Sequence, residues 1–239
     1  MGSSAVGAEP LKVLYLDAHL LAVDKPAGRI VIPGRGAPER TLQDEAAAAH
    51  GRLWIVHRLD RGTSGVLLFA RTPEAHRAVN LAFDRGEPAK RYLAIVRGEV
   101  PVRAVLDSAI AAGRRGRMRA VAPDDPRGKR ARTEIRLLES FPERPPLPAL
   151  SFVEATPRTG RTHQIRVHLA SAGAPLAVDP EYGEAGPLRD GGGAMLLART
   201  PLHAASLELL HPASGRALRI EAPLAPDLAV LLARLRSGT

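Results

Sequence analysis

The stretch IVHRLDRGTSG, residues 55–65, gathers charged and titratable side chains directly before a Thr-Ser-Gly turn. His57, Arg58, Asp60 and Arg61 lie within five residues, a cluster too charged for an ordinary core strand. A positive charge within about 4–6 Å favours the ionised form of a carboxylic acid, so an aspartate paired with a buried arginine is an anion at neutral pH. Such a carboxylate can act as a nucleophile or as a base. The alternative interpretation is a salt bridge that only joins two elements.

A second cluster of polar side chains lies in TGRTHQIRVHLASAG, residues 159–173. A helix in this segment would begin at a Thr162 cap and would place His163 and Arg166 on one polar face, at i, i+3. A strand would instead group Arg166 with the side chains two residues before and after it. The segment is therefore a second candidate carrier of chemistry, with helix and strand both open.

Metal-dependent chemistry is a weaker interpretation of the same residues. His57, Asp60, His163 and His168 are of the types that bind zinc or iron. However, the last two histidines are five residues apart, outside the i, i+4 spacing of a helical two-histidine site, and the neighbouring arginines would repel a dication. A serine hydrolase is weaker still, because Ser64 does not lie in a G-x-S-x-G turn. We therefore expect no metal.

The composition favours a nucleic-acid partner and a reducing compartment. Thirty-four Lys and Arg against 25 Asp and Glu give a formal charge of +9, which favours binding to a polyanion, although an ordinary basic surface is the alternative. Aromatic residues, at 3%, are too few for a platform that stacks single-stranded bases. The chain has no cysteine, and its apolar runs are far shorter than the roughly 20 residues of a membrane span. We therefore expect a cytoplasmic protein that does not enter membranes.

The elements that must position these residues mix strands and helices without a regular βαβ alternation, which predicts an α+β fold. Alternating hydrophobicity predicts a hairpin over residues 11–28 and buried strands over 65–71 and 90–100. Between these strands, a helix is predicted over 72–86, with Thr72 as its cap and proline at its first position. The other predicted elements are strands at 130–140 and 149–157, a hairpin at 202–223 and a helix at 225–238.

Two loops interrupt this scheme. Residues 114–132, RRGRMRAVAPDDPRGKRAR, contain eight basic and two acidic residues, which predicts an arm that follows RNA phosphates. The alternative is a flexible charged hairpin without a partner. Residues 184–194 are rich in glycine but follow no strand-turn-helix pattern of a phosphate-binding loop, so we expect a plain surface loop there.

Taken together, these segments resemble the RluA-type RNA pseudouridine synthases. HRLDRGTSGVLLFAR is similar to that family's signature, HRLD followed by x-x-TSG, and KRYLAIVRGEV to its K-x-Y-x-A stretch. TPRTGRTHQIRVHLASAG is similar to its TGRTHQIR segment, and LHAASLELLHP to its LHA…HP ending. These specific motifs occur in the family's order over almost the whole chain. The resemblance implies the pseudouridine synthase catalytic fold, with a mixed and mainly antiparallel central sheet and an active-site cleft across it.

The resemblance also implies an isomerase that flips a uridine out of structured ribosomal or transfer RNA and converts it to pseudouridine. Asp60 matches the essential aspartate, Tyr92 the tyrosine that stacks on the target base and assists proton removal at C5, and Arg166 the arginine that pairs with the aspartate. Arg58 matches the residue that takes the place of the flipped nucleotide, and Leu202 is expected in the base pocket. No cofactor is implied, because uridine and pseudouridine are isomers.

Basic side chains along the expected cleft are predicted to contact RNA phosphates. They are Arg61, Lys90, Arg161 and His163, and, in the basic segment, Arg114, Arg115, Arg117, Lys129 and Arg130. His57, His163 and Gln164 belong to the motifs, but we expect them to orient neighbouring loops through hydrogen bonds rather than to react. Gly65 is expected to let the following strand leave the cleft.

The chain departs from the family pattern at two positions. Gly62 replaces the usual acidic residue, and Val178 stands where the family usually has glycine. The signature begins almost at once, which predicts a flexible segment at residues 1–10 and one catalytic domain over 11–239, without an S4-type RNA-binding domain. We expect this domain to act as a monomer.

A competing hypothesis is a non-catalytic RNA-binding or ribosome-assembly factor that keeps the same fold. A pure RNA binder has no use for an acidic side chain that faces a phosphate-rich ligand. Retention of Asp60 together with Tyr92 and Arg166 therefore argues for the enzyme.

Overall fold

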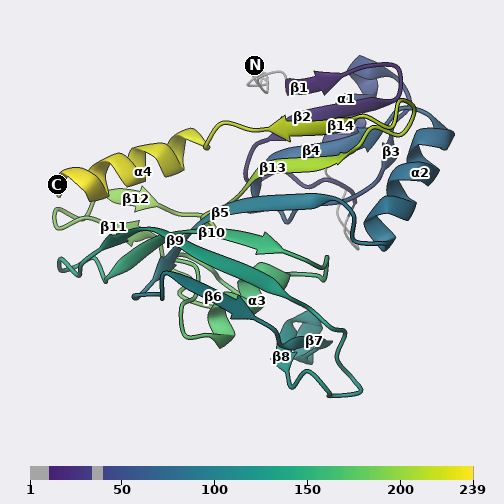
Figure 1. Ribbon diagram of the computed structural model, residues 1–239. Coiled ribbons are helices and arrows are strands. Elements are labelled where there is room, and N and C mark those ends of the chain that lie inside the picture. The colour runs from purple at the N-terminus through teal and green to yellow at the C-terminus, as the bar shows by residue number, and fades with distance from the viewer. Residues whose placement is uncertain (1–10, 34–39, 239) are drawn as a thin grey trace, which may run out of the picture.

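A computed structural model describes residues 11–33 and 40–238 of the chain; the predicted flexible segment at 1–10 lies outside the described residues. One mixed sheet of ten strands runs through the molecule (Figure 1). Its strands are β1 (Lys12–Leu16), β2 (Leu20–Lys25), β3 (Trp54–Ile55), β4 (Ser64–Ala70), β5 (Ala89–Arg97), β6 (Arg103–Leu106), β9 (Thr133–Phe141), β10 (Leu150–Pro157), β13 (Leu202–Leu210) and β14 (Ala217–Glu221).

The path of the sheet is β1-β2-β4-β13-β5-β10-β9-β6, with β14 paired to β13 and β3 to β4. The pair of β13 and β4 is parallel, and every other pair of this sheet is antiparallel. The α+β class and the mixed, mainly antiparallel sheet are therefore confirmed.

In the described ranges, four helices pack on the two faces of this sheet (Figure 1). They are α1 (Leu42–His50), α2 (Pro73–Asp84), α3 (Gln164–Ser171) and α4 (Pro226–Ser237). The buried residues of α2 pack with one face of β4 and those of α1 with the other. In the second half, α3 packs on Ala94 and Val96 of β5, whereas α4 packs with Ile95 on the opposite face. The alternation predicted for the strand at 90–100 is thus present.

Most local predictions are confirmed. Helix α2 has the predicted cap, because Thr72 Oγ1 accepts a hydrogen bond from the backbone N–H of Ala75 at 3.1 Å, and Pro73 is its first residue. The two predicted hairpins are present as β1–β2 and β13–β14. The prediction of a plain loop at 184–194 was wrong, because β11 (Leu188–Arg189) pairs there with β12 (Met195–Leu197). Leu188 and Leu197 are buried against the leucines of α4, and this burial stabilises the pairing of β11 with β12.

The basic segment forms a hairpin that stands beside α3. Strand β7 (Ala109–Ala112) pairs with β8 (Met118–Val121), and the 3₁₀ turn η1 (Arg114–Gly116) joins them. Ile110 and Ala131 pack against Val167 of α3 in a small apolar cluster. This contact anchors the basic hairpin, by which we mean residues 109–132.

Gly65 allows the one parallel pair to form. Its φ is +107°, and a Cβ atom at this position would lie 2.2 Å from the carbonyl oxygen of Ala204 on β13. The glycine is therefore required for close approach of two strands; the expectation that it lets the strand leave the cleft did not anticipate this contact.

We predict that Gly65→Ala destabilises the protein by about 2–4 kcal/mol, because the new methyl group meets backbone that cannot rotate away. Urea unfolding measures this change. Gly215→Ala, in the turn between β13 and β14, is the matched control, since Gly215 also has a positive φ, +68°, but nothing lies within 4 Å of its added Cβ. It is expected to cost only about 1 kcal/mol, and equal losses in both variants would contradict the contact argument.

No helix in the described part of the chain has the length and apolarity needed to span a membrane.

Candidate active site

Asp60 lies in the loop between β3 and β4, and a buried lysine holds this loop in place. Lys25 is fully buried at the end of β2, and its Nζ donates to the carbonyl oxygens of Pro26 (3.0 Å), Arg61 (3.2 Å) and Thr63 (2.7 Å). Burial lowers the pKa of Lys25 to about 7; Asp60 opposes this shift, while neighbouring arginines add to it. The backbone that directly follows Asp60 is thus fastened to the end of β2.

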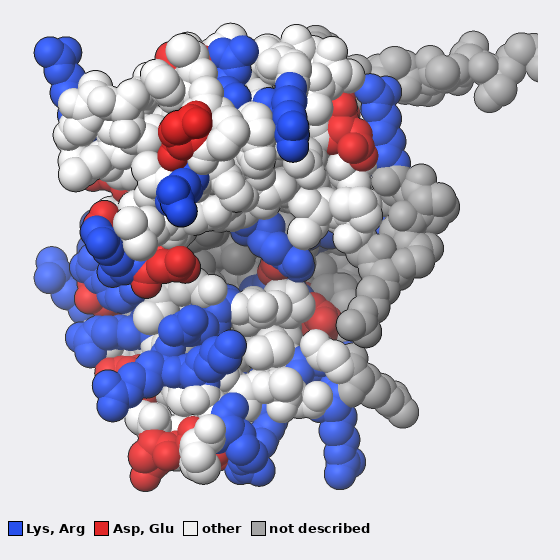
Figure 2. All heavy atoms as spheres, turned by 90° about the vertical axis from the view of Figure 1, so that its right-hand side faces the viewer, with Lys and Arg blue, Asp and Glu red and all other residues white. Residues whose placement is uncertain are grey.

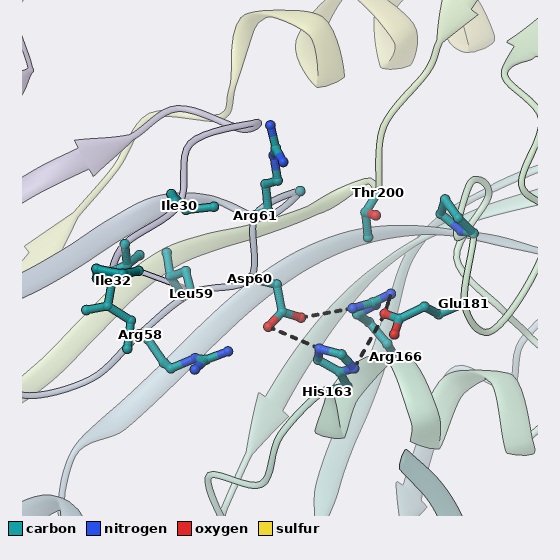
Figure 3. Close-up of a pocket in the computed structure, with 14 residues that line it drawn as sticks. Ile30, Ile32, Arg58, Leu59, Asp60, Arg61, His163, Arg166, Glu181 and Thr200 are labelled. Atoms are coloured by element: carbon teal, nitrogen blue, oxygen red, sulfur yellow. Dashed lines mark hydrogen bonds and ion pairs between the residues drawn. The ribbon is translucent and has the colours of Figure 1, made fainter. Parts of the chain in front are cut away.

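Arg166 of α3 is the cation at the centre of the site (Figure 3). Its Nη1 donates to Asp60 Oδ2 at 3.2 Å, and its Nε and Nη2 donate to the two carboxylate oxygens of Asp179 at 2.8 and 2.7 Å. Nη2 also donates to Glu181 Oε2 at 2.6 Å. Although burial opposes the charge, Asp179 and then Asp60 and Glu181 raise the pKa of Arg166, so the guanidinium stays charged.

The segment 159–173 forms a helix, so the strand interpretation was wrong. The predicted cap was also wrong, because α3 begins at Gln164 and its N-cap is His163 rather than Thr162. His163 has left-handed backbone, φ 55° and ψ 20°, and makes no side-chain cap. His163 and Arg166 nevertheless meet at Asp60, where His163 Nε2 lies 3.6 Å from Asp60 Oδ1.

Asp60 stands where two cavities meet. The larger cavity, about 600 Å³, includes Tyr92 and Leu202 in its lining, and the smaller one, about 380 Å³, includes Ile30 and Ile32. Both cavities are lined by Arg58, Leu59, Asp60, His163 and Arg166. Figure 2 shows a hollow across this face, with acidic side chains inside it and Lys and Arg side chains around it. The structure thus has a cleft across the sheet with a carboxylate in it.

Tyr92 brings an aromatic ring to the same cavity. It lies on β5, packed between the clusters that contain Ala204 and Leu202. Burial, together with the negative charge of Asp60, raises the pKa of Tyr92, so the side chain is a neutral phenol near pH 7. Leu202 is 4% exposed and forms part of the apolar lining.

Five predicted RNA contacts lie along the cleft: His163, described above, and Arg58, Lys90, Arg161 and Arg61. Arg58 lines both cavities, is exposed and makes no hydrogen bond or ion pair with any residue that the structure describes. Lys90 lines the larger cavity, and its Nζ donates to Thr159 O at 3.2 Å; burial, and then the charge of Arg161, lowers its pKa. Arg161 lines the same cavity, whereas Arg61 lines the smaller one and its Nε donates to Gly28 O.

The remaining predicted RNA contacts lie on the basic hairpin, outside the lining of both cavities. Those with exposed side chains are Arg114, Arg117, Lys129 and Arg130. Arg115 lies in η1, and its side chain is outside the described part of the structure. Catalytic candidates and hairpin residues therefore occupy two adjoining but separate surfaces.

Hydrogen bonds of the motif residues orient the loops, as we expected. His57 Nε2 accepts from the backbone N–H of Leu68 at 3.0 Å, and burial together with the charge of Lys90 lowers the pKa of His57 to about 4. Gln164 binds Thr159 Oγ1 through Oε1 and Arg132 O through Nε2. Both side chains therefore support the backbone around the cleft.

Sequence reasoning missed the acidic partners of Arg166. Asp179 and Glu181 follow α3 in the DPEYG segment, whose side chains had no predicted role. The signal available was physical: an arginine inside a helix that faces the core needs more than one partner, because a buried charge must be balanced and hydrogen-bonded. Lys25 was missed as well, although a buried lysine also needs hydrogen-bond partners, here three backbone carbonyl oxygens.

The two departures from the family pattern have simple packing explanations. A Cβ atom at Gly62 would lie 2.9 Å from Thr200 Oγ1, so glycine suits this close contact. Val178 is 1% exposed and packs in the cluster of Ile95 and α4. Val178 therefore adds to the apolar core.

Nothing in the described ranges gathers three or more His, Cys, Asp or Glu side chains in a metal-binding arrangement. The cation that balances Asp60, Asp179 and Glu181 is the guanidinium of Arg166.

Comparisons with known proteins identify the family. Residues 19–171 match the family model described as RNA pseudouridylate synthase. The chain is 41% identical over 242 residues to ribosomal large subunit pseudouridine synthase D of Xanthomonas campestris pv. campestris, covering 96% of this chain and 71% of that protein. It is 36% identical over 232 residues to ribosomal large subunit pseudouridine synthase C of Vibrio cholerae, covering 95% and 70%.

A solved structure shows the same fold. Human RNA pseudouridylate synthase domain containing 1 superimposes with a TM-score of 0.74 at 26% identity, covering 99% of this chain and 98% of that chain. The family model matches more than half of the chain, and the relatives match nearly all of it. The chain therefore belongs to the RNA pseudouridylate synthase family, isomerases that act on RNA.

Proposed function

We propose that this protein isomerises specific uridines of large-subunit ribosomal RNA to pseudouridine, with Asp60 as the catalytic carboxylate. The observation that carries the proposal is the placement of Asp60, paired with Arg166, at the base of a cavity that also holds Tyr92. The choice of ribosomal RNA is supported by relatives named as ribosomal large subunit synthases, which match nearly the whole chain.

The cavity suits a flipped nucleotide. A glycosidic bond inside a stacked helix is out of reach, so the enzyme must extrude the base at a cost of a few kcal/mol. Stacking on the ring of Tyr92 returns about 1–3 kcal/mol of this cost. Arg58, exposed between the two cavities, is placed to fill the space that the nucleotide leaves. Phosphate contacts of Lys90, Arg161 and the basic hairpin supply salt-dependent affinity.

The reaction breaks the bond between N1 and C1′ and forms one between C5 and C1′, while C5 loses a proton and N1 gains one. Asp60 serves this reaction as a nucleophile at C1′ or C6, or as a base at the ribose 2′ position, and all three routes need an ionised carboxylate within reach of the sugar. In each route the carboxylate loses its negative charge. Tyr92 lines the same cavity and is placed to assist the later proton transfer at C5.

We further propose that residues 11–239 act as one catalytic domain, as a monomer in the cytoplasm. A single sheet that continues from β1 to β6 supports the single domain, and the absence of cysteine supports the reducing compartment.

The substrate is tested with unmodified transcripts of large-subunit ribosomal RNA, small-subunit ribosomal RNA and transfer RNA. After incubation with the purified protein, pseudouridine is mapped by carbodiimide labelling and primer extension. New pseudouridine in the large-subunit transcript alone is the expected result. Modification of only transfer RNA would contradict the proposed substrate and leave the isomerase chemistry intact.

The basic hairpin is predicted to contribute affinity without chemistry. Arg117→Ala combined with Lys129→Ala should weaken RNA binding and lower the slope of log K against log salt by about 2, because each lost phosphate contact removes about one unit. Single-turnover rates at saturating protein should stay unchanged. Arg234→Ala with Arg236→Ala on α4, far from the hairpin in Figure 1, is the matched control and should leave both quantities unchanged.

Tyr92 is predicted to have separable stacking and proton-transfer roles. Tyr92→Phe keeps the ring, so RNA affinity should persist, but loss of the hydroxyl should slow tritium release from uracil C5 by about 10² or more, the usual contribution of acid–base catalysis. Tyr92→Leu should in addition weaken binding of RNA by about 1–3 kcal/mol. Equal RNA affinities for the Phe and Leu variants would contradict the stacking role.

A further inference from the structure

His163 has an unusual backbone that turns its ring toward Asp60. Of the residues that the structure describes, it is the one non-glycine residue with a positive φ. This conformation is uncommon outside glycine, asparagine, aspartate and histidine, and it persists where surrounding contacts hold it. In Figure 3 the ring lies directly beside the Asp60 carboxylate, and its side chain is 17% exposed. His163 thus lies inside the cleft, with most of its side chain buried beside Asp60.

The two ring nitrogens of His163 face different partners. Nδ1 lies 2.8 Å from the hydroxyl of Tyr182, within hydrogen-bond distance. It also lies 3.5 Å from Glu181 Oε2, the oxygen to which Arg166 Nη2 donates at 2.6 Å. Nε2 lies 3.6 Å from Asp60 Oδ1, the carboxylate oxygen that Arg166 does not hold. Arg166 Nη1 binds the other oxygen, Oδ2, at 3.2 Å. Asp60 is therefore flanked by a guanidinium on one oxygen and an imidazole on the other.

The hydroxyl of Tyr182 determines which nitrogen of a neutral His163 carries the proton. The backbone N–H of Met118 donates to the Tyr182 oxygen at 3.0 Å, and among the described residues His163 Nδ1 is the acceptor within hydrogen-bond distance of the phenolic proton. Burial raises the pKa of Tyr182, so the phenol keeps this proton near pH 7. With Nδ1 as acceptor, the proton of the imidazole lies on Nε2 and points toward Asp60.

We propose that His163 and Tyr182 are positioning residues for the reaction: the hydroxyl of Tyr182 holds His163 as its Nε2–H tautomer, and Nε2–H faces Asp60 Oδ1 and electrostatically favours one orientation of the carboxylate. This inference rests on the proposed role of Asp60. With Arg166 Nη1 bound to Oδ2 and Nε2–H facing Oδ1, the two side chains oppose rotation of the carboxylate. Partners that orient metal ligands in a comparable way contribute about 10–100-fold to metal affinity or activity, and we expect an effect of similar size here.

The same contacts join the site to the basic hairpin. Met118 is the first residue of β8, and Tyr182 packs beside the cluster of Ile110, Ala131 and Val167 that anchors the hairpin on α3. The ring of Tyr182 also lies 4.9 Å below the guanidinium of Arg166. Docking of the RNA-facing hairpin and orientation of Asp60 therefore depend on one phenol.

The decisive variant is Tyr182→Phe, which keeps the ring against Arg166 and the apolar cluster but removes the hydroxyl. We expect kcat about 10-fold lower, with the RNA dissociation constant unchanged. His163→Asn tolerates left-handed backbone and should show a similar loss. Because the two residues act in series, the double variant should be no slower than His163→Asn. Tyr15→Phe is the matched control, since it also removes one tyrosine hydrogen bond, the one to Asp17. Neither residue lines either cavity, so this variant should leave kcat unchanged.

The tautomer is measured independently of turnover by two-bond ¹H–¹⁵N correlation NMR on histidine-labelled protein, at about pH 8, where an ordinary imidazole is neutral. The His163→Asn spectrum assigns the signal. We expect the Nε2–H pattern in the wild type and a mixture of both tautomers in Tyr182→Phe. An Nδ1–H pattern in the wild type, an unchanged pattern in Tyr182→Phe, or additive losses in the double variant would overturn the inference.

These results also separate the inference from the proposed function. A wild-type protein that shows the Nε2–H pattern but releases no tritium would contradict the proposed function while supporting the Tyr182–His163 contact. An active wild type whose activity is lost in Asp60→Asn but unchanged in Tyr182→Phe and His163→Asn would support the proposed function and overturn the inference.

Discussion

Asp60→Asn is expected to lower kcat by about 10⁴-fold or more, the size of loss seen when an essential reacting side chain is removed. Asparagine has nearly the same shape as aspartate but is neither a useful nucleophile nor a base, so every route available to Asp60 is closed at once. RNA affinity should be equal or slightly higher, because a negative charge that faces phosphates is removed. Single-turnover tritium release measures the first quantity, and filter binding to the same RNA the second.

The matched control is Asp84→Asn. Asp84 is an exposed carboxylate in the lining of the larger cavity, so its removal changes the cavity charge as Asp60→Asn does. It should keep kcat within about threefold, in line with the small effects of surface substitutions. If both variants lost activity equally, the loss would reflect the charge of the cavity, and the role of Asp60 as the reacting group would be wrong.

Arg166→Met is expected to cost about 3–5 kcal/mol of folding stability and most of the activity, because it leaves the buried carboxylate of Asp179 without a cation. Asp179 is only 1% exposed, and Asp60 and Glu181 lose the same partner. Urea unfolding and tritium release measure the two effects. Arg236→Met, which breaks an exposed pair with Glu139, is the control and should cost at most about 1 kcal/mol.

The folding stability that Arg166→Met loses should become smaller as pH falls. Burial raises the pKa of Asp179, but the hydrogen bonds and charge of Arg166 outweigh this and lower it overall. In the wild type, the stability supplied by this pair is therefore present above the ordinary aspartate range and is lost as pH falls through the lowered pKa. In Arg166→Met the buried carboxylate is costly only while ionised, so the gap between the two proteins should narrow as pH falls toward about 4. A gap that widens on acidification would contradict the ion-pair account.

Much of the fold is predictable from local sequence. Thr72 and Pro73 specify the start of α2, and the alternation of Tyr92, Ala94 and Val96 with Leu93 and Ile95 specifies both faces of β5. These signals are properties of neighbouring residues. The small sheet of β11 and β12 was missed because its strands have only two and three residues, too short for a period, and form through burial against α4.

The site is predictable only in part. The motifs place Asp60, Tyr92 and Arg166 in one cleft, and the structure brings them together from a loop, a strand and a helix. Asp179 and Tyr182 were not predicted as partners, because their contacts with Arg166 and His163 depend on how the segment after α3 folds back over that helix. The left-handed backbone of His163 has no sequence signal beyond histidine's mild tolerance for it.

The most direct test of the central claim is the stoichiometry of conversion on large-subunit ribosomal RNA transcribed with uridine labelled with tritium at C5. Released tritium and pseudouridine, the latter recovered after nuclease digestion and chromatography, are counted in the same samples. We predict one released tritium for each pseudouridine formed, in buffer without any added cofactor, and neither product with Asp60→Asn. RNA that is bound by the wild-type protein but yields neither tritium nor pseudouridine would contradict the account and indicate a binding protein with a synthase fold.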